Sequence, residues 1–145
     1  MTTEIQFVVP GNPVGKGRPK FARRGNFVTA YTPEKTASYE NLVKVKAEES
    51  MVGLQLIEGA VSVEIRLHVT VPESWSQKKK NAALAHQIMP TSKPDADNCI
   101  KGIFDAMNGI VWNDDKQVTD LHVIKRYSEK PCAVVFVTQI DLKVA

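Results

Sequence analysis

The sequence predicts an α+β fold in a single domain, with a mixed β-sheet and about three helices. Helical and strand-like hydrophobic patterns are interspersed along the chain, without the regular alternation that a parallel sheet requires. The chain has 145 residues, 43% of them hydrophobic, which is enough to bury one core and leaves little room for a second domain. We therefore expect residues 1–145 to form one domain.

The first third of the chain predicts two short strands and a helix. Ile5–Val9 is a β-rich run that stops at Pro10-Gly11, which is typical of a strand followed by a turn. Residues 11–25 are rich in glycine, proline and basic side chains, so we expect a loop. Phe27–Tyr31 is expected to form a brief strand. Apolar residues then recur at helical spacing and predict a helix over residues 34–51.

The rest of the chain predicts three more strands and two more helices. Residues 61–71 alternate valine, isoleucine and leucine with polar residues, which is the clearest strand pattern in the sequence. Helices are expected over residues 76–87 and 97–107, the second with its apolar residues on one face. Residues 118–127 and 133–140 are expected to form the last two strands. This order of elements favours a mixed sheet.

Charge is distributed unevenly, although the net charge is only +3. Residues 95–120 hold six aspartates and two lysines, a net charge of −4, while the remainder has 17 basic and 10 acidic residues, a net charge of +7. A metal-dependent enzyme that acts on a polyanion needs such a distribution, because acidic groups hold cations and a basic surface holds phosphates. Chance clustering on a solvated face would give the same charges.

Other features exclude several classes of protein. Two cysteines, Cys99 and Cys132, are too few for a disulfide framework or a structural zinc site. The longest apolar stretches are far too short to span a bilayer. The first residues have neither the basic nor the apolar segment of a secretion signal. We therefore expect a cytoplasmic protein that does not associate with membranes.

The segment 93–101 contains candidate catalytic residues. Asp95 and Asp97 flank one residue at the expected start of a helix, so both carboxylates can approach one site. Mg²⁺ prefers carboxylate ligands together with substrate phosphate. Lys101 shares the helix face of Asp97, where it could stabilise charge on a phosphate or orient an attacking water. Alternatively, Asp97 caps the helix, Asp95 lies in the preceding turn and Lys101 forms a surface ion pair.

A second acidic pair, Asp114 and Asp115, follows the expected third helix. The chain must fold back along a helix of roughly 16 Å if Asp115 is to meet Asp97, and Asn108-Gly109 permits such a reversal. Carboxylates that converge repel one another unless they share a cation. A shared cation is therefore the economical interpretation of both pairs, whereas the second pair alone would be interpreted as a solvated turn.

Two segments of this region each contain a motif with characteristic spacing. The segments are Lys93-Pro94-Asp95-Ala96-Asp97-Asn98-Cys99-Ile100-Lys101, with Phe104-Asp105-Ala106-Met107 after it, and Val111-Trp112-Asn113-Asp114-Asp115-Lys116-Gln117-Val118. They resemble the core of the RusA family of Holliday-junction resolvases, in which Asp-x-Asp-Asn-x-x-Lys precedes Phe-Asp-Ala-Leu and Trp-x-Asp-Asp-x-Gln-Val. Weaker similarity covers Gly15–Pro19 and Tyr31–Thr36, and Lys125 lies where the family often has a basic strand residue.

The resemblance implies a homodimeric, Mg²⁺-dependent endonuclease that nicks two strands of a four-way DNA junction. The matching positions are Asp95, Asp97 and Asp115 for the catalytic, metal-binding aspartates and Lys101 for the essential lysine. The implied mechanism is metal-assisted phosphodiester hydrolysis, with in-line attack by water. Asp114 could share the role of Asp115, and Asp105 is expected to make a structural contact.

Five basic residues fall within nine positions of the expected loop. They are Lys16, Arg18, Lys20, Arg23 and Arg24. We expect this segment to contact DNA phosphates, and the neighbouring Phe21 and Phe27 could stack at a junction. The alternative is a solvated loop. Lys78–Lys80 is a second candidate for phosphate contact, and a solvated helix start explains it equally well.

Two other functions account for part of the pattern. A protein that binds DNA junctions without cutting them would use the aspartates only for caps and turns. Another type of Mg²⁺ enzyme, such as a nucleotide-sugar transferase, also contains Asp-x-Asp. The longer Asp-Asn-x-x-Lys pattern and the basic segment argue against this last function.

Overall fold

The computed structural model describes residues 2–17, 20–25, 27–31 and 34–141. The chain forms a single α+β domain with a mixed sheet and three α-helices, as predicted. In chain order the elements are β1 (Glu4–Pro10), β2 (Lys20–Arg24), β3 (Phe27–Tyr31), α1 (Glu34–Ser50), β4 (Val61–Val69), α2 (Gln77–Leu84), α3 (Ala96–Met107), the 3₁₀-helix η1 (Asp115–Gln117), β5 (Val118–Tyr127) and β6 (Cys132–Gln139).

The main sheet has the strand order β1-β6-β4-β5. β4 runs parallel to β5 and antiparallel to β6, and β1 pairs antiparallel with β6, so the sheet is mixed. The alternation predicted for residues 61–71 is confirmed over Val61–Val69, where every second side chain is buried. Because the side-chain period of a strand is two, this alternation fixes which face of the central strand meets the core.

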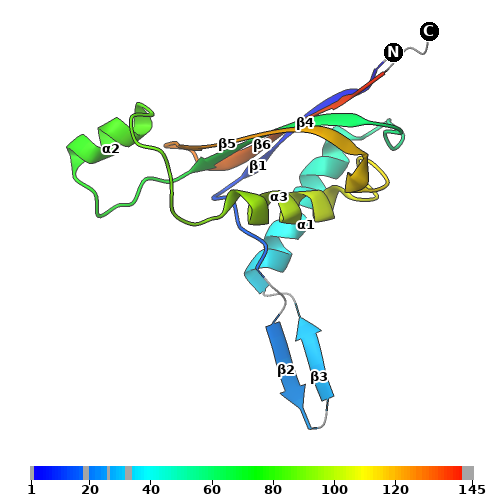
Figure 1. Cartoon of the computed structure of the whole chain (residues 1–145), viewed down its shortest axis with the longest axis horizontal. Helices are drawn as coiled ribbons and strands as arrows, with labels where there is room; N and C mark the ends of the chain where they lie inside the picture. Colours follow the sequence, from blue (N-terminus) through cyan, green and yellow to red (C-terminus); the bar gives the residue numbers. More distant parts are fainter. Residues whose placement is uncertain (1, 18–19, 26, 32–33, 142–145) are drawn as a thin grey trace.

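Helices α1 and α3 lie on the same side of the main sheet (Figure 1). α1 packs against α3 and β1. α3 buries most of one face, including Ile100, Ile103 and Met107, in the main core. Trp112 is fully buried just beyond this helix, with its ring 5.3 Å from that of Phe104 in an edge-on contact. The aspartates before and after α3 are therefore attached to a helix whose position the core determines.

A smaller core cluster holds α2 at the far end of the sheet. Val69, Ala83 and Tyr127 are buried together, and the ring of Trp75 packs edge-on against Tyr127. Ser76 is the N-cap of α2, because its side chain accepts a hydrogen bond from the backbone N–H of Lys79. The helix predicted over residues 76–87 is thus confirmed, although it ends three residues earlier.

The expectation of a loop over residues 11–25 is wrong for Lys20–Arg24, which forms strand β2. β2 pairs antiparallel with β3, and Arg24–Phe27 is the last pair of the hairpin. Gly25 has a φ of 60°, the left-handed conformation that glycine adopts without strain. A Gly-Asn pair between two strands is a known hairpin signal, which the basic composition obscured. The hairpin projects from the rest of the fold (Figure 1).

Candidate functional site

The N-terminal end of α3 presents two exposed carboxylates. Asp95 occupies the N-cap position with extended backbone, yet its side chain makes no capping hydrogen bond to the helix. Asp97 lies in the first turn, where the helix dipole favours a negative charge. Asn98 donates from Nδ2 to Asp95 Oδ2 at 3.4 Å, and within the described ranges neither carboxylate accepts another hydrogen bond from a side chain. The alternative in which Asp97 caps the helix is wrong, because Asp95 holds the N-cap position and Asp97 lies within the helix.

Lys101 lies one turn after Asp97, and its side chain is 67% exposed. Its Nζ is 3.9 Å from Asp105 Oδ2, a long ion pair on a mostly solvated side chain. Such a pair contributes a few tenths of a kcal/mol. Lys101 is thus accessible to an incoming anion on the same helix face as Asp97.

Asp105 instead takes part in a tighter ion-pair cluster with Lys16 and Glu40. Lys16 Nζ lies 2.8 Å from Asp105 Oδ2 and 2.8 Å from Glu40 Oε1, and the Lys16 side chain is only 21% exposed. The structural contact expected for Asp105 is confirmed. Glu40, on α1, carried no signal in the sequence, because it lies 24 positions from Lys16 and 65 from Asp105.

The backbone of Lys16 also fixes the preceding loop to α3. Its N–H donates to the carbonyl oxygen of Asn98 at 3.0 Å. A Cβ at the neighbouring Gly15 would lie 3.2 Å from Asn98 Cβ, closer than most Cβ contacts, so glycine allows the loop to approach α3 here. The ion-pair cluster raises the pKa of Lys16, mainly through the hydrogen bond to Asp105 and then through that to Glu40. Lys16, predicted to contact DNA, therefore has its charge balanced within the protein.

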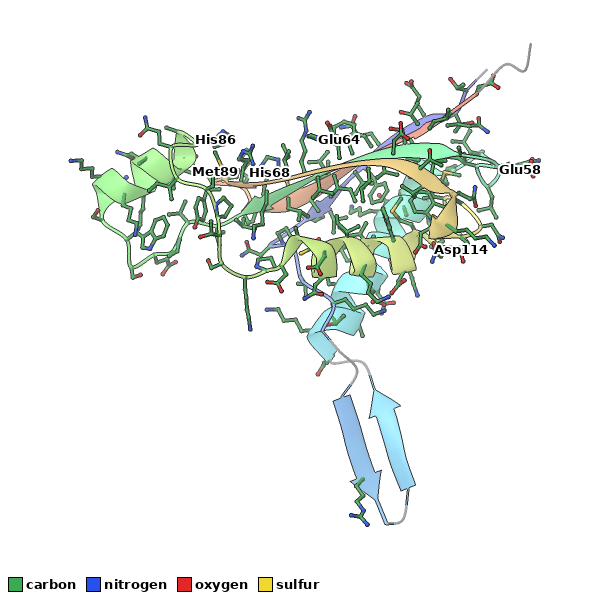
Figure 2. The ribbon with its side chains drawn as sticks, viewed as in Figure 1. Glu58, Glu64, His68, His86, Met89 and Asp114 are labelled. Carbon is green, nitrogen blue, oxygen red and sulfur yellow. The ribbon has the colours of Figure 1, made fainter. Side chains whose placement is uncertain are left out.

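Asp115 lies beyond the opposite end of α3, in η1. Its Oδ2 accepts a hydrogen bond from Asn108 Nδ2 at 3.4 Å, and Asn108 Oδ1 accepts one from Trp112 Nε1 at 2.6 Å. Asp114 has a different role, because it caps η1 by accepting from the N–H of Lys116 at 2.9 Å. Of the two neighbouring carboxylates, Asp115 is the one that is bonded to Asn108 at the end of α3. Figure 2 labels Asp114 near the same end of the helix.

Gln117 fastens this turn to the rest of the fold. Its Oε1 accepts from the N–H groups of Asn113 and Asp114, and its Nε2 donates to the carbonyl oxygens of Ile57 and Gly59. The Trp-x-Asp-Asp-x-Gln-Val segment is thus a folded unit. Its tryptophan is buried in the core, its first aspartate caps η1 and its glutamine bonds the backbone of residues 57 and 59. The second aspartate has none of these structural roles.

One chain does not gather the three predicted metal ligands Asp95, Asp97 and Asp115. The first two precede or begin α3 and the third follows it, and twelve helical residues span about 18 Å. Among the described residues no three His, Cys, Asp or Glu side chains lie close enough to hold a metal ion. Within one subunit the structure offers a pair of carboxylates at one end of α3 and a single carboxylate at the other.

Lys125, on β5, anchors the segment that leads into α3. Its Nζ donates to the carbonyl oxygens of Ser92 and Pro94, each at 2.9 Å. This contact fixes the backbone immediately before Asp95. Cys99 is buried behind the site, where burial raises the pKa of its thiol to about 11 and keeps it protonated at neutral pH.

The remaining predicted DNA contacts lie on the β2–β3 hairpin. Lys20, Arg23 and Arg24 belong to β2, and Arg23 is exposed, with its Nε 3.2 Å from the carbonyl oxygen of Gly25. Arg18 lies outside the described residues. Lys78, Lys79 and Lys80 lie on α2, where Lys79 Nζ stands 3.9 Å from the ring centre of Trp75.

These residues lie in an α+β domain with a mixed sheet, and comparisons with known proteins give its family. The profile of the family described as Endodeoxyribonuclease RusA matches residues 10–138. The chain belongs to the RusA endodeoxyribonuclease family. It is also 36% identical over 139 residues to a Bacillus subtilis (strain 168) protein described as "Uncharacterized protein YqaN", covering 94% of this chain and 97% of that protein. No helix within the described ranges is long and apolar enough to cross a membrane.

We predict that Lys16 contributes mainly to stability. Replacing it by methionine removes the 2.8 Å ion pairs of two half-buried carboxylates and leaves Asp105 only its long pair with Lys101, so Lys16→Met should lower the free energy of unfolding by about 1–3 kcal/mol in urea denaturation at pH 8. Because the pKa of Lys16 is raised above 10.5, this stabilisation is complete below pH 10.5 and is lost as the pH rises through the raised value.

The matched control is Lys46→Met on α1, where Lys46 Nζ lies 3.6 Å from Glu49 in a more exposed pair. That substitution should cost less than about 0.5 kcal/mol. Equal, small effects of both substitutions would show that the Lys16 cluster is not structural.

Proposed function

We propose that this protein is a Mg²⁺-dependent, structure-selective endonuclease of the cytoplasm that resolves four-way DNA junctions by paired symmetrical nicks. Family membership supports the endonuclease activity and the junction substrate. The observation that supports the chemistry best is the exposure of three side chains at the start of α3, namely Asp95, Asp97 and Lys101. Side chains needed only for capping or ion pairing would be engaged with the helix.

The residues present fit a magnesium ion. Asp95 and Asp97 offer hard oxygen ligands, both exposed, and Mg²⁺ is commonly held by one or two carboxylates together with substrate phosphate. A bound cation would supply positive charge against the charge that develops on the phosphoryl group. Lys101 would hold a non-bridging phosphate oxygen from the same helix face, which orients the phosphodiester before attack.

The position of Asp115 leads us to propose that a homodimer completes the site. Two copies with their α3 helices antiparallel about a twofold axis would each bring Asp115 to the partner subunit's Asp95 and Asp97. The same symmetry accounts for paired cuts, because a four-way junction needs two nicks related by a twofold axis. Each active site would then depend on both chains.

The β2–β3 hairpin is proposed to grip DNA outside the cutting site. It projects from the body with Lys20, Arg23 and Arg24 on one strand (Figure 1). DNA affinity depends on such phosphate contacts and on the counterions that they release. The alternative function, a protein that binds junctions without cutting them, would use the same hairpin. The two functions differ only in whether the residues at α3 cut DNA, so cleavage assays distinguish the endonuclease from the junction-binding protein.

We predict that Asp97→Asn abolishes cutting while junction binding persists or strengthens. The substitution keeps the shape of the side chain but removes a negatively charged ligand. The rate at which a synthetic four-way junction is nicked in Mg²⁺ should therefore fall by about a hundredfold or more. Removing one negative charge should not weaken the grip on phosphate.

Asp120→Asn on β5 is the control, because Asp120 is exposed, is not among the candidate site residues, and its substitution removes the same charge. It should cut at nearly the normal rate. Cutting that continues in EDTA, or an Asp97→Asn protein that cuts normally, would contradict the metal site. An unmodified protein that binds but never cuts would favour the alternative function.

We further predict that neutralising the hairpin flattens the salt dependence of binding. Each lost phosphate contact reduces the slope of log K against log salt by about 0.9, so Arg23→Ala combined with Arg24→Ala should reduce it by nearly two units. Fluorescence anisotropy with a labelled junction over a salt series measures this slope. An unchanged slope would mean that the hairpin does not contact DNA.

A further inference from the structure

A cavity of about 620 Å³ opens beside the candidate site and shares Asp95 and Asn98 with it. Its walls come from the loop around Asn12–Gly17, the start of α1, the end of β4 with residues 70–72, and residues 90–95 before α3, together with Asn98 on α3 and Tyr127 on β5. This volume falls within the range of about 300–1,000 Å³ typical of pockets that enclose a small organic group. The mechanism proposed above does not use this space.

The lining of the cavity has the chemistry of a site for a nucleobase. Buried apolar surfaces come from Pro13, Val69, Pro90 and Tyr127, which suit the faces of a flat ring. Charged lining residues are two exposed lysines, Lys35 and Lys93, and the single acid Asp95. A flat, neutral group linked to a phosphate matches this combination better than a free polyanion does.

The hydrogen bonds of Asn12 fix the direction of its amide. The side-chain oxygen accepts from the backbone N–H of Thr70 at 3.1 Å and lies 3.3 Å from the Thr70 hydroxyl. A backbone N–H can only donate, so the atom facing Thr70 must be Oδ1, and Nδ2 points elsewhere as a donor. Asn98 is oriented in the opposite sense, because its Nδ2 faces the carboxylate of Asp95 and its Oδ1 remains an acceptor.

The walls are also held in place before any ligand binds. Lys125 fixes the carbonyl oxygens of Ser92 and Pro94, and the N–H of Lys16 fixes the loop to Asn98. The N–H of Gly11 donates to the carbonyl oxygen of Pro131 at 3.1 Å. A preformed cavity with one oriented donor and one oriented acceptor can distinguish hydrogen-bonding edges of bases, because a wrong edge leaves a polar group unpaired.

We propose that this cavity receives one unpaired nucleotide adjacent to the scissile phosphate, and that Asn12 hydrogen-bonds its base. The inference rests on the proposed function, because the phosphate held at Asp95 and Asp97 is what brings the neighbouring nucleotide to the cavity. Asn12 is then a specificity-determining residue outside the catalytic set. Nucleotides near the branch point of a four-way junction are the easiest to unpair, so the cavity also favours cuts near the branch.

The test removes bases one at a time. Four-way junctions are prepared in which each nucleotide within three positions of the cut is replaced by an abasic residue, and the nicking rate is measured in Mg²⁺. We expect a loss of about tenfold at one flanking position, the scale of a single base contact, and little change at the others. A protein that cuts the intact junction but shows no sensitive position would overturn the cavity proposal.

Asn12→Asp is the decisive variant. The aspartate keeps an oxygen for both bonds from Thr70 but replaces the amide donor, so the tenfold difference between the intact and the abasic junction should shrink to the part that the apolar walls supply. Asn81→Asp on α2 is the matched control. Asn81 also accepts a hydrogen bond through Oδ1, from Gln77, and lies outside the cavity, so its variant should retain the tenfold ratio.

A tenfold ratio that persists in Asn12→Asp would overturn the role of Asn12. A wild-type protein that cuts no four-way junction would refute the proposed function itself, and with it this inference. The two failures are therefore distinguishable in the same assay.

Discussion

Packing of α3 into the core fixes the distance between the candidate catalytic acids. Ile103 and Met107 are fully buried, and a helix held in this way cannot bend its ends together. Asp95 and Asp97 are therefore held at one end and Asp115 at the other. The separation is a property of helix length, since each residue adds 1.5 Å, roughly. Any function that needs these acids together must bring them from different subunits.

Two half-buried lysines hold the surroundings of the site, and neither is proposed to act on DNA. Lys16 neutralises Glu40 and Asp105 and ties the preceding loop to α3. Lys125 anchors the carbonyl oxygens of the segment before Asp95. Lys101, in contrast, is mostly exposed on the same helix. The sequence alone does not distinguish these lysines. The fold does, because two of them have close partners within the protein and the third is mostly exposed.

Periodicity sufficed to predict the central elements. The alternation over 61–71 and the helical spacing over 97–107 each reflect a single buried face, so local sequence contains the necessary information. The structural role of Asp105 was also foreseen. The partnership of Lys16 with Glu40 was not, because it joins distant segments and leaves no local pattern. Strand β2 was missed because its basic residues resemble those of a loop.

The expected meeting of Asp115 with Asp97 failed within one chain for a physical reason. The chain does reverse at Asn108-Gly109, but Trp112 then enters the core and its Nε1 bonds Asn108. This bond keeps the following turn beside the C-terminal end of α3. The sequence indicated that the chain could reverse at Asn108-Gly109. It did not indicate that burial of Trp112 would keep the following turn at the C-terminal end of α3.

Complementation between two inactive variants tests the shared site most directly. Asp97→Asn and Asp115→Asn subunits carrying different affinity tags are coexpressed, and the heterodimer is purified through both tags. If each site combines residues of two chains, one site receives both substitutions and the other neither. The heterodimer should then nick a four-way junction at about half the wild-type rate, with single rather than paired nicks, while both homodimers are inactive. A heterodimer as inactive as its parents would contradict the shared site.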